Sequence, residues 1–139
     1  MASQKDKQAY IDEMVRQRGY VLEYHKVLTQ QDFDVMRAAN DLVDAAYLKQ
    51  RRLDRKTKEL IFIVSLTVMG ASKGHIQSHI RVALDLGVPE EEILEAIEIA
   101  LPEAGVVAFQ HGFDAWREVV GAEGIEPTVE AHEGGSDAR

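Results

Sequence analysis

The chain has 139 residues, of which 45% are hydrophobic, and this is the length of a single domain that can bury a core. The 24 acidic and 16 basic residues give a net charge of −8, which disfavours binding to nucleic acid or to anionic membrane surfaces. The chain contains no cysteine, which excludes a disulfide, a thiolate nucleophile and Cys-ligated zinc.

The N-terminal residues, MASQKDKQAYIDEM, are polar and lack the apolar stretch of a signal peptide. The most apolar run, LIFIVSLTVMG at residues 60–70, is too short to span a bilayer. We therefore expect a cytoplasmic protein that acts on a small molecule and has no nucleic-acid or membrane partner.

Helical periodicity dominates most of the chain, which has only three prolines and no alternating strand pattern. A first helix is predicted at residues 5–18, ending before Gly19. A second is predicted at residues 31–50, where apolar side chains recur at three- and four-residue spacing. The third, RKTKELIFIVSLTVM, is predicted to have Asp54 as its N-cap and to end or kink at Gly70.

Three more helices are predicted after this break. The fourth begins near Ser72 and ends at Gly87, and the fifth opens with Pro89 and three glutamates at its positive end. Pro102 is predicted to break the chain before a last helix at residues 103–120. The predicted fold is all-α, a compact bundle of about six helices.

The C-terminal sequence, GAEGIEPTVEAHEGGSDAR, is rich in glycine and acidic residues and has few apolar side chains to bury. Such a composition is typical of disordered segments. We therefore divide the chain into a helical domain at residues 1–120 and a disordered acidic tail at residues 121–139.

Two histidines in the fourth predicted helix are the first candidates for chemistry. His75 and His79 are four residues apart, so their side chains lie on one face of that helix. Apolar neighbours place the pair at the edge of the core. Histidines at this spacing are more often a solvated or core-edge pair than a functional site, and spacing alone is a weak signal.

Glu59 is the only acidic residue between Asp54 and Asp85, and it precedes the apolar body of the third predicted helix. Two interpretations remain open. Glu59 is an exposed first-turn glutamate favoured by the helix dipole, or it is a carboxyl group with a raised pKa that is hydrogen-bonded to a histidine of the next helix.

The third and fourth predicted helices are joined by only a few residues around Gly70, so they are expected to pack as antiparallel neighbours. Glu59 and His79 then differ in height by about one helical turn of 5.4 Å. We predict that the two side chains are paired, directly or through one water, because pairing relieves the desolvation cost of each.

Other charged and polar residues are less distinctive. His111 lies among large apolar residues in EAGVVAFQHGFDAW and is a core-edge histidine or a third polar group in the same pocket. His25 has no comparable context. One basic cluster is formed by Arg51, Arg52, Arg55, Lys56 and Lys58. It is interpreted as a solvated helix start, although it is also suited to attract an anionic substrate.

Several stretches of the sequence resemble the carboxymuconolactone decarboxylase family, which includes the alkylhydroperoxidase D-like proteins. They are LDRKTKELIFIVSL at residues 53–66, the two-histidine segment, HIRVALDLGVPEEEILEAIEIAL at residues 79–101 and AGVVAFQHGFDAW at residues 104–116. The resemblance covers residues 49–120 and implies a compact helical protein that assembles into trimers or hexamers.

The redox branch of that family has a C-x-x-C-x-x-x-H motif, in which a Glu and a His also relay protons. Matching its histidine to His79 puts the two cysteine positions at Ser72 and His75, neither of which forms a thiolate. The relay glutamate matches Glu59, although the spacing to the histidine is one residue longer here. Thiol-dependent peroxidase activity is therefore not expected.

The decarboxylase branch also lacks the thiols, and the resemblance implies a lyase that needs no cofactor. Such an enzyme acts on a small unsaturated lactone or oxo acid by general acid–base catalysis. We expect His79 to be the main acid/base residue, Glu59 its orienter or proton partner, and His75 a contact to an oxyanion or carboxylate. Ser72 and His111 are expected to contact the substrate.

Two other classes of function remain open. A metal-binding protein would use His75, His79 and a third ligand such as Glu59 or His111. Against it, Ile76 replaces the glutamate that follows the first histidine in the common metalloprotease motif. The second alternative is a non-catalytic helical oligomer that binds a small molecule. The lyase hypothesis and the metal-binding hypothesis both require His75, His79 and Glu59 to converge on one pocket.

Overall fold

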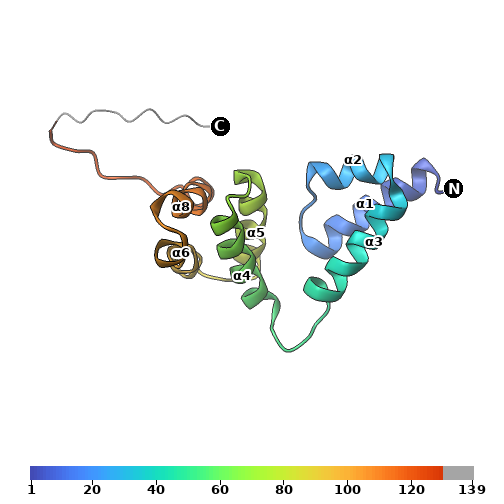
Figure 1. The fold of residues 1–139 in the computed structure, drawn as a ribbon, viewed down its shortest axis with the longest axis horizontal. Helices are drawn as coiled ribbons and strands as arrows, with labels where there is room; N and C mark the ends of the chain where they lie inside the picture. Colours follow the sequence, from blue (N-terminus) through green and yellow to red (C-terminus); the bar gives the residue numbers. More distant parts are fainter. Residues whose placement is uncertain (130–139) are drawn as a thin grey trace.

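The computed structural model describes residues 1–129, which form eight α-helices and one short π-helix without any strand. The predicted all-α class is confirmed. Figure 1 shows two groups of helices joined by a linker at residues 49–54. Within the described residues, no helix has both the length and the apolar character needed to cross a membrane. Of the predicted tail, residues 122–129 have no helix or strand, and residues 130–139 lie outside the described part of the chain.

The N-terminal group contains α1 (Gln4–Arg18), α2 (Glu23–Gln31), α3 (Phe33–Val43) and the π-helix η1 (Asp44–Leu48). The first helix is confirmed, but the helix predicted at residues 31–50 begins only after Asp32, whose side chain accepts the backbone N–H of Val35. The helix α2 was not predicted as a separate element. Its sequence, EYHKVLTQQ, buries only His25 and Thr29, so it carries no apolar stripe that the pattern could show.

The C-terminal group contains α4 (Arg55–Met69), α5 (Lys73–Asp85), α6 (Glu90–Glu98), α7 (Ala100–Ala104) and α8 (Val106–Val120). Three predicted helix ends are confirmed here. Asp54 accepts the backbone N–H of Thr57 at 2.7 Å as the N-cap of α4, and Ser72 accepts that of His75 at 3.3 Å at the start of α5. Gly70 ends α4 in the left-handed region, with φ of 67°.

The break predicted at Pro102 is wrong. Pro102 lies within α7, where it is tolerated because the N–H groups of a first helical turn have no intrahelical acceptor. The chain turns instead at Gly105, whose φ of 89° favours glycine. The last helix therefore begins at Val106 rather than at residue 103.

The core of the C-terminal group lies between α4, α5, α6 and α8. Five of its isoleucines are completely buried: Ile63, Ile76, Ile80, Ile93 and Ile97. Burying one such side chain contributes about 1.5–3 kcal/mol of stability. This shared core holds α4 and α5 side by side, and these two helices carry the candidate site.

The helix α8 packs closely against α4 at Gly112. A β-carbon at this position would lie 2.7 Å from Thr67 Cγ2 and 3.0 Å from Ile97 Cγ2. Thr67 is fully buried and donates to the carbonyl of Ile63 at 2.7 Å, so its side chain has little freedom to move. We expect Gly112→Ala to lower the free energy of unfolding by about 1–3 kcal/mol, as measured by urea denaturation.

Gly74→Ala is the matched control for this prediction. Gly74 lies in the first turn of α5, and a β-carbon there would meet nothing within 4 Å. The control is expected to be neutral or to stabilise the fold by up to about 1 kcal/mol. A Gly112→Ala protein as stable as the wild type would show that α8 does not pack this closely.

Candidate functional site

Glu59 and His79 form a buried pair between α4 and α5. Both side chains are fully buried, and His79 Nδ1 lies 2.7 Å from Glu59 Oε2. The pairing predicted from the sequence is confirmed as a direct contact. It closes the expected difference in height without a bridging water, because α4 and α5 pack against each other along the hairpin.

Two further groups bind the other carboxylate oxygen of Glu59. The hydroxyl of Tyr47, from η1, donates to Oε1, and Arg55 Nε donates to the same oxygen at 2.8 Å. Arg55 lies one turn before Glu59 on α4, so helical spacing brings both to one face. Arg55 Nη2 also donates to the Tyr47 hydroxyl at 2.9 Å, and the guanidinium lies 4.6 Å from the centre of the tyrosine ring. The carboxylate thus has donors from three elements.

These contacts determine the charge of Glu59. Burial raises its pKa, but the hydrogen bonds from His79, Tyr47 and Arg55 outweigh burial and lower the pKa below its ordinary value. Of the two sequence interpretations, the exposed first-turn glutamate is wrong, because Glu59 is fully buried. The contact with a histidine is correct, but the pKa of Glu59 is lowered rather than raised. Burial and the hydrogen bond to Glu59 raise the pKa of Tyr47, which keeps its hydroxyl protonated as a donor.

An ionised Glu59 determines which ring nitrogen of His79 carries a proton. A carboxylate only accepts, so Nδ1 is the donor and Nε2 is the nitrogen available for proton exchange. Nε2 lies 3.3 Å from the hydroxyl of Tyr20, whose pKa is raised by burial. The imidazole is stacked on Phe62, with 4.5 Å between ring centres. The reactive nitrogen is therefore held in one orientation, facing the N-terminal group.

The structure brings His75 to this pair, but not Ser72 or His111. The ring of His75 is half-buried, and its centre lies 5.5 Å from that of His79. Burial, and then the charge of His79, lower the pKa of His75. Ser72 is exposed, and its hydroxyl caps α5. His111 is exposed on α8 beside the C-terminal end of α4, away from the pair. His75, His79 and Glu59 therefore converge, as the enzyme hypotheses require, whereas Ser72 and His111 do not join them.

Three members of the site were not identified from the sequence. Arg55 was grouped with a solvated basic cluster, although its position four residues before Glu59 was a readable signal. Tyr47 lies within residues 31–50, where the sequence indicated only an apolar helix. Tyr20 lies between α1 and α2, 59 residues before His79, and no local pattern connects them.

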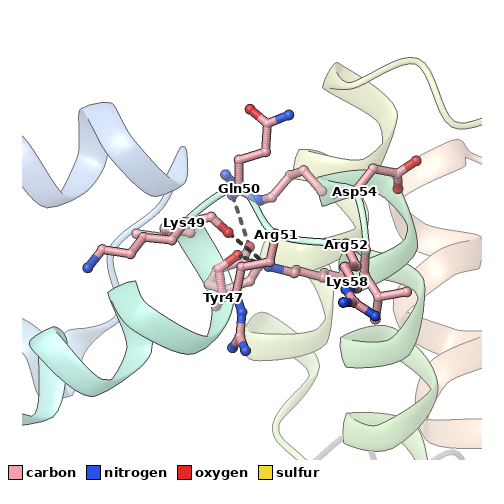
Figure 2. A pocket seen from close by; sticks show the side chains of 10 residues that line it. Tyr47, Lys49, Gln50, Arg51, Arg52, Asp54 and Lys58 are labelled. Atoms are coloured by element: carbon pink, nitrogen blue, oxygen red, sulfur yellow. Dashed lines mark hydrogen bonds between the residues drawn. The ribbon is translucent and has the colours of Figure 1, made fainter.

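A pocket of about 370 Å³ opens beside the pair at the linker, a size that suits a small molecule. Tyr47 and Arg55 line it and also bind Glu59, so they form the wall between the pocket and the buried carboxylate. Figure 2 shows Lys58 donating to the carbonyls of Tyr47 and Lys49, both at 3.1 Å. The other labelled basic side chains extend in different directions, so they do not converge on one point.

Within residues 1–129, no three His, Asp or Glu side chains are grouped closely enough to hold a metal ion. His79 uses Nδ1 to contact Glu59. The metal-centre hypothesis therefore has no ligand set in the described chain.

A second polar cluster lies next to the site in the N-terminal group. Arg18 is 3% exposed and His25 is 1% exposed. The sequence offered no context for His25, yet its Nδ1 accepts the backbone N–H of Leu22 at 2.9 Å. Burial, and then the charges of Arg18 and His75, lower the pKa of His25 to about 4. The ring is therefore neutral at pH 7.

The neutral state of His25 predicts a dependence of stability on pH. Its folded pKa of about 4 lies below the ordinary 6.5, so the unfolded chain binds the proton more readily. The contribution of the neutral His25 ring to stability is fully present above pH 6.5 and is lost as the pH falls to 4. We expect the free energy of unfolding to decrease by roughly 3 kcal/mol across this window, as measured by urea titrations. His25→Gln should flatten the profile, and an unchanged slope in that variant would refute the assignment.

The model of the carboxymuconolactone decarboxylase family matches residues 34–118, which is more than half of the chain. The matched range contains the Glu59–His79 pair together with His75, Tyr47 and Arg55. A comparison with curated proteins found no match. On the family match, the chain belongs to the carboxymuconolactone decarboxylase family.

Proposed function

We propose that the protein is a cofactor-independent lyase that decarboxylates a small unsaturated lactone or oxo acid. Membership of the family supports decarboxylase-like or alkylhydroperoxidase-like chemistry. The chain has no cysteine, so thiol-dependent peroxide reduction lacks its nucleophile. The observation that carries the proposal is the buried pair of His79 and Glu59, in which Nε2 of the histidine is left available for proton exchange.

The reaction needs a proton donor but no electron carrier. The electrons of the breaking carbon–carbon bond flow through the ring double bond into the lactone carbonyl, which releases carbon dioxide and leaves a dienolate. The dienolate then takes up one proton. In this proposal the protonated Nε2 of His79 supplies it, and the imidazolium is stabilised by the adjacent carboxylate of Glu59.

The other residues have distinct proposed roles. Because its pKa is lowered, Glu59 orients the ring and balances its charge rather than exchanging the proton itself. The hydroxyl of Tyr20, close to His79 Nε2, is a donor for the developing oxyanion. A neutral His75 offers one further ring N–H at the edge of the site.

A screen of unsaturated lactone acids and oxo acids for carbon dioxide release tests the proposal. The wild type is expected to release carbon dioxide from at least one of them without an added cofactor. The His111→Ala variant is the matched control, because His111 is exposed and away from the pair, and it should keep the wild-type rate. No release from any member of either substrate class would overturn the proposal.

We also propose that the chain assembles into trimers or hexamers. Large apolar side chains are exposed on the C-terminal group, among them Met69, Ile99, Leu101, Val106 and Val107. An interface between subunits would remove these surfaces from water. We expect light scattering at micromolar concentration to give the mass of three or six chains. A strictly monomeric mass would contradict the assembly.

A further inference from the structure

Arg18 is a buried cation without an acidic partner. In the described part of the chain, no carboxylate lies within ion-pair distance of its guanidinium. Its Nη2 donates to the side-chain oxygen of Asn40, and its buried Nε has no hydrogen-bond partner. A charge surrounded only by neutral groups is unfavourable in a protein interior, and buried charges are normally paired. Within residues 1–129, the chain itself therefore supplies no anionic group to balance the charge of Arg18.

The contact between Arg18 and His25 also lacks an acceptor. The backbone N–H of Leu22 donates to His25 Nδ1, so the ring carries a proton on Nε2. This Nε2 lies 3.4 Å from Arg18 Nη1, and a guanidinium nitrogen only donates. Two donors therefore face each other with no acceptor between them. A carboxylate, with two negatively charged oxygens, would satisfy both.

Tyr20 connects these donors to the reactive nitrogen of His79. Tyr20 follows Arg18 by two residues, and its hydroxyl reaches His79 Nε2. The backbone carbonyl of Arg18 accepts a hydrogen bond from Arg55 Nη2 at 2.9 Å, which ties the end of α1 to the start of α4. The unpaired donors and the Glu59–His79 pair are thus held on neighbouring parts of one interface.

We propose that Arg18 and His25 bind a carboxylate group of the same small molecule that reacts at His79. This inference rests on the proposed lyase function and narrows its substrate class. The carboxylate that is held is one that the reaction retains. A cation bound to the departing carboxylate would stabilise the substrate more than the transition state, because that group leaves as neutral carbon dioxide. The substrate is therefore an acid with a second carboxylate, held by Arg18.

The test is calorimetric titration of the full chain with crotonate and with crotonamide, its uncharged analogue. The wild type is expected to bind crotonate and not crotonamide. Arg18→Met keeps the length of the side chain without its charge and should raise the Kd for crotonate at least about tenfold. Arg81→Met removes an exposed cation from α5 and is the matched control, with an unchanged Kd.

Stability separates a binding role of Arg18 from a merely structural one. Without ligand, Arg18→Met should unfold at the same or a higher urea concentration than the wild type, because it removes an uncompensated buried charge. If that variant does not fold, Arg18→Gln decides, since it keeps hydrogen-bond donors but no charge. It must also weaken crotonate binding at least about tenfold, or the proposal fails.

Other outcomes also overturn the carboxylate site. Equal binding of crotonate and crotonamide, or an equal Kd in Arg18→Met and Arg81→Met, would do so. A wild type that binds no crotonate, together with a smaller assembly for Arg18→Met, would show that a carboxylate of a second copy fills the position. The carboxylate site and the lyase activity can fail independently. If crotonate binds through Arg18 but no carbon dioxide is released from any substrate, the carboxylate site is supported and the lyase proposal is overturned. If carbon dioxide is released and Arg18→Met has an unchanged KM, the lyase proposal is supported and the carboxylate site is overturned.

Discussion

Replacing His79 with alanine is expected to lower turnover by roughly 10²–10⁴-fold, the usual range for loss of a general acid or base. In the proposed reaction, Nε2 of this ring gives the proton that completes decarboxylation. No neighbour takes over that role. Burial raises the pKa of Tyr20, the pKa of Glu59 is lowered, and burial lowers the pKa of His75, which keeps that ring neutral. The loss should appear in kcat, measured as carbon dioxide released per unit time.

A second variant is needed because His79 is completely buried and stacked on Phe62. Alanine at this position leaves a cavity and destabilises the fold. At the edge of the core, where the sequence placed His79, the same change would cost less stability. His79→Gln fills more of that space and can still donate to Glu59, but an amide does not exchange a proton near neutral pH. It should show the same loss of turnover with less loss of stability. Wild-type turnover in this variant would exclude His79 as the proton donor.

The hairpin of α4 and α5, which holds the Glu59–His79 pair, could be predicted from the sequence because capping and helix-ending residues close to it in the chain determine its ends. Asp54 and Ser72 are N-caps that act within three residues of themselves, and Gly70 supplies the left-handed residue that ends α4. Two helices joined by so short a connection pack against each other. The contact between Glu59 and His79 then follows from their positions along the two helices.

The charge of Glu59 was not readable in the same way. Its pKa depends on a balance between burial and the number of donors, and those donors come from η1, α4 and α5. A sequence pattern shows that a carboxylate is near an apolar helix, but it does not count distant partners. Tyr20, Arg18 and His25 were missed for the same reason. Their roles depend on the contact between Arg18 and His25 and on the contact of Tyr20 with His79 of α5, which no local sequence pattern shows.

Removing the carboxylate with Glu59→Ala is expected to lower the free energy of unfolding at pH 7 by about 3–5 kcal/mol, the range for breaking a buried ion pair on one side. The change leaves Arg55 Nε, the Tyr47 hydroxyl and His79 Nδ1 without their acceptor. The folded pKa of Glu59 is lowered from its ordinary 4.5, so its contribution to stability is present above that pH. It is lost as the pH falls through the folded pKa.

Urea denaturation at pH 7 and in acid therefore gives a signed test of the ionised Glu59. The stability difference between wild type and Glu59→Ala should be largest at neutral pH and should shrink in acid, because the protonated wild-type side chain no longer balances Arg55. Glu59→Gln separates charge from shape. The amide oxygen of the glutamine in this variant still accepts from Tyr47 and Arg55, so the fold should be better preserved than in Glu59→Ala.

The same variant also tests turnover. The amide N–H₂ faces His79 Nδ1, and this moves the ring proton to Nε2. Neutral His79 then has no lone pair at Nε2 to reload with a proton from solvent, and turnover should fall by roughly 10²–10⁴-fold although the protein remains folded. A stability difference that grows in acid, or full turnover in Glu59→Gln, would show that Glu59 is not the ionised partner that orients His79.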